Sequence, residues 1–219
     1  MKKISKNKLL LFIMSFLLLL PIVRVNAVMG NTTTFIYSED FFTGDKNTVS
    51  SYYQKFISHG KPSRTTARPT SVFAMQQELK NSESVFISSH GTEIGSVIVL
   101  STSDNSTNLF NCSDVPKNMS CKLAYISVCY SAKNNAATGL NLCSTLVKNG
   151  YATAIGYNTA VSSSKSRIYE NIVIDRMLEG DSVYEALMYA KKHLLQISKN
   201  TYGEIISSCV VYGDLELKL

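Results

Sequence analysis

Short apolar runs alternate with segments of helical apolar spacing along most of the chain. Runs such as 85–87 (VFI) and 123–128 (LAYISV) are rich in β-branched or aromatic residues, which is typical of buried strands. In segments such as 164–178 the apolar residues recur every three or four positions, which predicts a helix. The predicted strands span 33–37, 85–87, 96–100, 123–128, 152–157 and 209–212. The predicted helices span 48–58, 71–79, 136–148, 164–178 and a segment from 182 to about 195, and 60–70 is expected to be a loop.

This alternation of strands with helices predicts an α/β fold with a mainly parallel sheet covered by helices. In such sheets, ligands bind outside the carboxyl ends of the strands. The side chains that directly follow the predicted strands are therefore the first candidates for a functional site.

The N-terminal 27 residues differ in pattern from the rest of the chain. They combine a basic start, an apolar run at 9–20 and an A-x-A-like sequence at 25–27 (VNA), as a secretory signal peptide does. The apolar run is shorter than the roughly 20 residues that a membrane-spanning helix needs. We therefore expect a signal peptide at 1–27 and a secreted single domain at 28–219, with no membrane partner after cleavage.

The basic charge of the chain is concentrated in this leader. The full sequence has 22 Lys and Arg against 16 Asp and Glu, and residues 1–27 hold five of the basic residues and none of the acidic ones. The expected mature chain is then close to neutral, with 17 basic residues against 16 acidic ones. Such a balance gives no reason to expect nucleic acid or an anionic membrane as a partner.

A histidine and a cysteine each follow a predicted strand. His90 comes shortly after 85–87, and Cys129 comes directly after 123–128. In a parallel sheet both would emerge at the same edge, where the imidazole could activate the thiol and later protonate a leaving amine. The backbone N–H groups of Gly91 and Cys129 could then bind the developing oxyanion.

The chain offers other interpretations of these residues. A cysteine taken alone is more often a buried structural thiol, since free cysteines are among the most buried residues. His59 also precedes a glycine, but it ends a segment of helical spacing and is expected to interact with the helix C-terminus. His193 lies inside a predicted helix and is interpreted as structural.

Five cysteines in an exported chain are an odd number, so at least one thiol lacks an intramolecular partner. Cys112 and Cys121 bracket a polar stretch and are the expected disulfide. Cys143 and Cys209 form a second bridge or remain buried thiols, and either arrangement leaves Cys129 alone. Neither CxxC nor H-E-x-x-H occurs in the sequence, so we expect no metal and no cofactor.

Two blocks of the sequence resemble a known family. VFISSHG at 85–91 and LAYISVCYSA at 123–132 are similar to the two signature blocks of the caspase-like cysteine peptidases, which include caspases, gingipains, clostripain and CHAT domains. The segments before the first block and after the second resemble gingipains and CHAT domains, and the resemblance covers most of 32–219. It implies a caspase-like three-layer sandwich with a mainly parallel sheet.

The resemblance also implies roles for individual residues. Cys129 would be the nucleophile, His90 the general acid/base, and Gly91 a contributor to the oxyanion hole. The sequence departs from the family pattern at Val128, where most members have alanine, and at Leu215, where gingipains have proline. It also has Ser127 where clostripain and metacaspases carry an acidic residue, which leaves the substrate preference open.

Family members select substrates partly through the loop after the first strand, and here that loop contains Asp45. By position, Asp45 matches the acidic residue of arginine-selective gingipains, which would favour cleavage after Arg or Lys. The alternative is that this aspartate caps a helix or lies in a solvated turn.

The sequence thus predicts a secreted cysteine endopeptidase that acts on a peptide or protein substrate through a thioester acyl-enzyme. The alternative is a catalytically silent binding or adhesion module that keeps the same scaffold. A redox role for Cys129 is disfavoured because no resolving cysteine lies nearby in the sequence.

Overall fold

A computed structural model describes residues 32–37, 43–67, 69–94, 96–103, 106–117 and 119–219. The expected signal peptide at 1–27 lies outside these residues. Within the described part of the chain, no helix has the length and apolar character to span a membrane.

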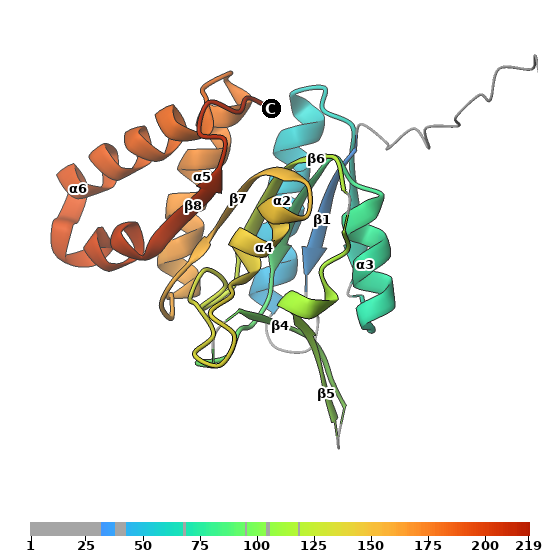
Figure 1. The fold of residues 1–219 in the computed structure, drawn as a ribbon. Coiled ribbons are helices and arrows are strands. Elements are labelled where there is room, and N and C mark those ends of the chain that lie inside the picture. Colours follow the sequence, from blue (N-terminus) through green and yellow to red (C-terminus); the bar gives the residue numbers. More distant parts are fainter. Residues whose placement is uncertain (1–31, 38–42, 68, 95, 104–105, 118) are drawn as a thin grey trace, which may run out of the picture.

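A six-stranded sheet forms the centre of the structure (Figure 1). Five strands are parallel, and the last one pairs antiparallel with its neighbour at one edge. The predicted mainly parallel sheet is therefore confirmed. In spatial order the strands are β2 (Ser63–Ala67), β1 (Thr33–Tyr37), β3 (Ser84–Ser88), β6 (Cys121–Ser127), β7 (Tyr151–Tyr157) and β8 (Cys209–Gly213).

Helices cover both faces of this sheet and complete a three-layer sandwich (Figure 1). Side chains alternate between the faces of each strand, so Phe86 of β3 joins one core cluster while Val85 and Ile87 join the other. The helices on the Phe86 face are α2 (Thr43–Ser58), α5 (Ser163–Leu178) and α6 (Val183–Ser208). The helices on the opposite face are α3 (Val72–Lys80) and α4 (Leu142–Lys148).

Aromatic rings dominate the core on the first face. Phe86 stacks on Phe35 of β1 and on Tyr125 of β6, with ring centroids 5.2 and 5.8 Å apart. Phe56 of α2 meets Phe86 edge-on at 5.2 Å. Such aromatic pairs stabilise by roughly 0.5–1.5 kcal/mol beyond the area they bury, so this cluster ties three adjacent strands to one helix.

Two predicted elements differ from the structure. Residues 63–67, predicted as part of a loop, form the edge strand β2, because parallel pairing with β1 satisfies the backbone of a polar segment that has no apolar pattern. The helix predicted from 136 begins only at Leu142, because the Asn141 side chain accepts a hydrogen bond from the Ser144 N–H at 2.8 Å and caps it there.

Further elements extend beyond the predictions, among them α2, which is predicted from 48 and begins at Thr43. The strand predicted at 96–100 is β4 (Val97–Ser103), and it pairs antiparallel with β5 (Ser106–Asn111) in a hairpin outside the main sheet. The last helix continues to Ser208, with a non-helical residue at Ser198 that marks a kink.

The disulfide predicted between Cys112 and Cys121 is absent from the structure, in which all five cysteines, all within the described part, are free. The Cys121 thiol donates to the Leu79 carbonyl of α3 at 3.6 Å, whereas the Cys112 thiol points to the Ser96 carbonyl at 3.9 Å. The two sulfurs therefore face different elements. Burial raises the pKa of four of the thiols, which keeps them protonated at neutral pH: Cys112, Cys121, Cys143 and Cys209, the last to about 12.

Replacement of Phe86 by alanine should lower the free energy of unfolding by roughly 3–5 kcal/mol, because it removes a ring that contacts three others and leaves a cavity. Phe73→Ala is the matched control, since that ring is 69% exposed, and it should change stability by less than about 1 kcal/mol. Urea unfolding followed by circular dichroism measures both. Equal losses in the two variants would contradict the central place of this cluster.

Candidate active site

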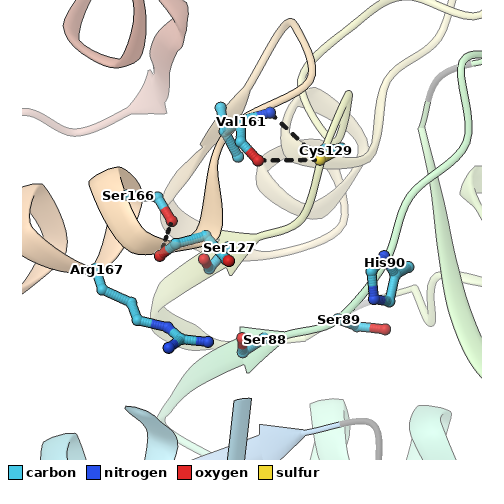
Figure 2. A pocket seen from close by; sticks show the side chains of 9 residues that line it. Ser88, Ser89, His90, Ser127, Cys129, Val161, Ser166 and Arg167 are labelled. Atoms are coloured by element: carbon cyan, nitrogen blue, oxygen red, sulfur yellow. Dashed lines mark hydrogen bonds between the residues drawn. The ribbon is translucent and has the colours of Figure 1, made fainter. Parts of the chain in front are cut away.

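His90 and Cys129 reach one cavity from two neighbouring strands. β3 and β6 are parallel, and Ser88 lies opposite Ser127 in their register. His90 lies two residues beyond Ser88, and Cys129 lies two residues beyond Ser127. Both side chains line a cavity of about 240 Å³ at the carboxyl edge of the sheet (Figure 2). The structure thus brings together the two groups that the sequence analysis paired.

Cys129 lies in a tight turn after β6. The next residue, Tyr130, has a φ of 61°, a left-handed conformation that costs a non-glycine residue about 1–3 kcal/mol. Three backbone hydrogen bonds hold this turn: Tyr130 N–H to Thr159 at 3.0 Å, Ala132 N–H to Tyr157 at 2.9 Å, and Ser96 N–H to Tyr130 at 2.9 Å. The thiol is thereby presented on a turn that the surrounding structure fixes.

The Cys129 thiol contacts the backbone of Val161 on the opposite wall of the cavity. The Val161 N–H donates to the sulfur at 3.3 Å, and the thiol lies 3.7 Å from the Val161 carbonyl oxygen (Figure 2). A hydrogen bond from N–H to sulfur strengthens when the sulfur becomes a thiolate. The loop before α5 is therefore part of the immediate environment of the thiol.

Gly91 packs directly against the turn that carries Cys129. A Cβ atom at this position would overlap the Cys129 carbonyl oxygen and press on the Val128 side chain. The carbonyl of the preceding residue, His90, accepts a hydrogen bond from Val99 of β4 at 2.9 Å, which ties this segment to the hairpin. Only glycine permits this approach, so the His-Gly pair and the cysteine turn form one packed unit.

Val128, which stands where the sequence blocks that it resembles mostly have alanine, is 1% exposed and belongs to the core cluster on the α3 and α4 face. Its side chain fills space beside Gly91. The substitution therefore adds apolar packing behind the cysteine turn.

A buried carboxylate lies beneath the cavity. Glu170 of α5 is 1% exposed and accepts hydrogen bonds from the hydroxyls of Ser127 at 2.6 Å, Tyr157 at 2.8 Å and Tyr52 at 2.9 Å. Burial raises the pKa of this carboxyl, while the three hydroxyls and the nearby Arg167 oppose the rise. Glu170 is not among the site residues predicted from the sequence. Its place on the apolar stripe of the helix, three and four residues before Val173 and Ile174, is a signal that indicates a buried carboxylate.

The other wall of the cavity consists of the loop before α5 and the first turns of that helix. Val161, Ser163, Ser166 and Arg167 line it, and the Ser166 hydroxyl donates to the Ser163 carbonyl at 3.2 Å. The sequence analysis did not assign these residues to the site. They are far from Cys129 in the chain, and only the tertiary fold brings them to the cavity.

The remaining candidates lie elsewhere. Asp45 falls in the first turn of α2, and its side chain lies outside what the structure describes, so its substrate-binding role stays a prediction. His59 is exposed at the end of α2, with its Nδ1 2.8 Å from the Lys55 carbonyl oxygen, and His193 stacks on Tyr189 in α6. Neither histidine lines the described cavity. Among the described residues, no cluster of three or more His, Cys, Asp or Glu side chains is placed to hold a metal ion.

A six-stranded, mainly parallel sheet between two helical layers, with its site at the ends of two central strands, is a caspase-like fold. The structure is similar to that of the Arg-specific cysteine proteinase gingipain R, with a TM-score of 0.67 and 10% sequence identity over 87% of this chain and 48% of that one. It is also similar to Saccharomyces cerevisiae separase in its complex with securin, with a TM-score of 0.56 and 16% identity over 86% of this chain and 12% of that one. The chain thus spans about half the length of the gingipain chain.

No protein-family model matches the sequence, and no curated protein matches it either. The structural similarity therefore confirms the caspase-like fold that the two sequence blocks imply. At 10% and 16% identity, the similarity to these two structures shows a shared fold. The chemistry of this chain depends on the residues of its own cavity.

Replacement of Glu170 by alanine should destabilise the protein by roughly 2–5 kcal/mol, because three buried hydroxyls lose their acceptor. Glu170→Gln should cost less, since the amide retains a carbonyl acceptor. The pKa of Glu170 is raised on folding, so the folded state binds the proton more tightly than the unfolded chain does. The stability of the wild type relative to Glu170→Gln should therefore fall as the pH rises above about 4. Urea unfolding of both proteins from pH 4 to 8 measures the difference, and a flat or rising difference would contradict the raised pKa.

Proposed function

We propose that the protein is a cysteine endopeptidase in which Cys129 is the nucleophile and His90 the general acid/base. The observation that carries the proposal is the convergence of these two side chains on one cavity from adjacent parallel strands, with Gly91 packed against the cysteine turn. The shared fold with the cysteine proteinases gingipain R and separase supports it.

The proposed reaction proceeds in two halves. His90 takes the Cys129 proton, and the thiolate attacks the carbonyl carbon of the scissile peptide bond. The C–N bond breaks, His90 protonates the departing amine, and a thioester links the acyl group to Cys129. Water then transfers a proton to His90 and attacks the thioester carbonyl. The C–S bond breaks, the carboxylic acid is released, and His90 returns the proton to the sulfur, which regenerates the thiol.

The oxyanion of each tetrahedral intermediate needs preorganised donors. In this proposal they are the backbone N–H groups of Gly91 and Cys129, and removal of one such donor typically costs about 10²–10³ in rate. The close packing of Gly91 on the cysteine turn supports this pairing, because it brings the Gly91 backbone against the backbone of Cys129.

Secretion belongs to the same proposal. It rests on the leader at 1–27. N-terminal sequencing of protein from the culture medium tests it, and the secreted chain is expected to begin at residue 28.

A second function is favoured by one observation, the orientation of the thiol. In Figure 2 the contacts drawn for the Cys129 sulfur run to Val161, on the side of the cavity away from the His90 ring. A catalytically silent binding module could keep the thiol in this orientation. An active peptidase must turn it toward the imidazole when the substrate enters.

Turnover of a fluorogenic peptide library with varied P1 residue distinguishes these functions. Cys129→Ala should abolish cleavage, and His90→Ala should lower it by about 10²–10⁴. Matched controls are Cys121→Ser, at the opposite end of β6, and His59→Ala on the surface, which should both retain activity. Full activity of Cys129→Ala would contradict the peptidase proposal. A folded wild type that cleaves no member of the library would favour the binding module.

The same library tests the role predicted for Asp45. If its carboxylate lines the S1 pocket, peptides with Arg or Lys at P1 should be preferred, and Asp45→Asn should remove that preference. A wild type without preference for these residues would refute the prediction.

A further inference from the structure

The cavity beside Cys129 contains a cation. Among the described residues that line this cavity, Arg167 carries a permanent positive charge. The lining also includes serine side chains: Ser88, Ser89, Ser127, Ser163 and Ser166. Figure 2 shows the Arg167 side chain extending from α5 with its guanidinium beside Ser88, and Ser127 lies between it and Cys129. Ser89, Ser127 and Ser166 already donate their single hydroxyl proton to other groups of the protein, so the guanidinium is the group of this lining that suits a carboxylate.

The arrangement of the neighbouring carboxylate is consistent with this role. Glu170 lies one turn after Arg167 on α5, is 1% exposed and is not among the lining residues. Its two oxygens already accept three hydroxyl hydrogen bonds. Glu170 therefore supports Arg167 electrostatically from beneath the cavity. A guanidinium carries five N–H donors in a planar fork, a geometry that matches the two oxygens of a carboxylate.

The position of the cavity identifies the part of a substrate that would occupy it. It borders the sulfur of Cys129, so in a peptidase it receives the side chain next to the scissile carbonyl, which is the P1 residue. Its volume of about 240 Å³ accommodates an aspartate or glutamate side chain. A lysine or arginine side chain in the same place would bring a second cation to Arg167, which costs free energy in a partly desolvated site.

We propose that this cavity is an S1 subsite for an acidic P1 residue, in which Arg167 binds the Asp or Glu carboxylate. The proposal rests on the peptidase function of the same site. It sets this chain apart from gingipain R, whose description as Arg-specific implies the opposite P1 charge.

The test uses one peptide sequence with six P1 residues: Asp, Glu, Asn, Gln, Arg and Lys. Because a charge-assisted hydrogen bond is stronger than a neutral one, kcat/KM for Asp or Glu should exceed that for the matching amide by about 10- to 100-fold. Arg167→Gln should remove this ratio, Arg167→Lys should retain part of it, and Arg167→Glu should shift the preference to Arg and Lys. Lys165→Gln, two residues earlier on the same helix and outside the described lining, is the matched control and should leave the ratio unchanged.

A binding measurement separates this proposal from the peptidase proposal. In the Cys129→Ala background, fluorescently labelled peptides that end in Asp-amide, Asn-amide or Arg-amide are titrated by anisotropy, with thermal unfolding as the check that each variant is folded. Tighter binding of the Asp peptide that disappears in Arg167→Gln supports the subsite even if turnover is never detected. A preference for the Arg peptide that Asp45→Asn abolishes would overturn the subsite while leaving the peptidase intact, and so would equal binding of all three peptides.

Discussion

The parallel pairing of β3 with β6 is the constraint on which the site depends. Backbone hydrogen bonds hold Ser88 opposite Ser127, and from that register the two strands deliver His90 and Cys129 to the same edge of the sheet. A shift of one residue in either strand would send every side chain to the other face. The aromatic stack through Phe86, on the face that α2 covers, makes such a shift costly. The core that stabilises the fold therefore also aligns the two reactive groups.

The buried carboxylate of Glu170 extends this alignment to the helices. It accepts hydrogen bonds from the end of β6, the end of β7 and the middle of α2, while it belongs to α5 itself. A buried charge is costly unless hydrogen bonds satisfy it, and here three hydroxyls do so. Four elements are thus joined at one point directly below the cavity, which restricts how α5 can sit relative to the cysteine turn.

Two opposite charges one turn apart on α5 occupy different environments. Glu170 points into the core, whereas Arg167 borders the open cavity. Their spacing on the helix keeps them close enough that the guanidinium lowers the pKa of the carboxyl against the effect of burial. The floor and the wall of the cavity are therefore linked through a single helix, which also contributes to the core.

The positions of the main strands and the convergence of His90 and Cys129 on one cavity could be predicted from the sequence, because buried strands leave a local apolar pattern and these two side chains follow it. The polar strand β2 and the five unbridged thiols could not, because a polar edge strand forms through its neighbour and the surroundings of a thiol depend on residues distant in the chain. The late start of α4 follows from a local cap, the Asn141 side chain on the Ser144 N–H, which the apolar pattern does not show. The same is true of the contact between Gly91 and the cysteine turn, and of Arg167 at the cavity. By itself, the sequence determined where the main strands lie, because the apolar pattern of a strand is local. The tertiary structure decided which groups surround the thiol, because those groups come from distant parts of the chain and meet only through packing.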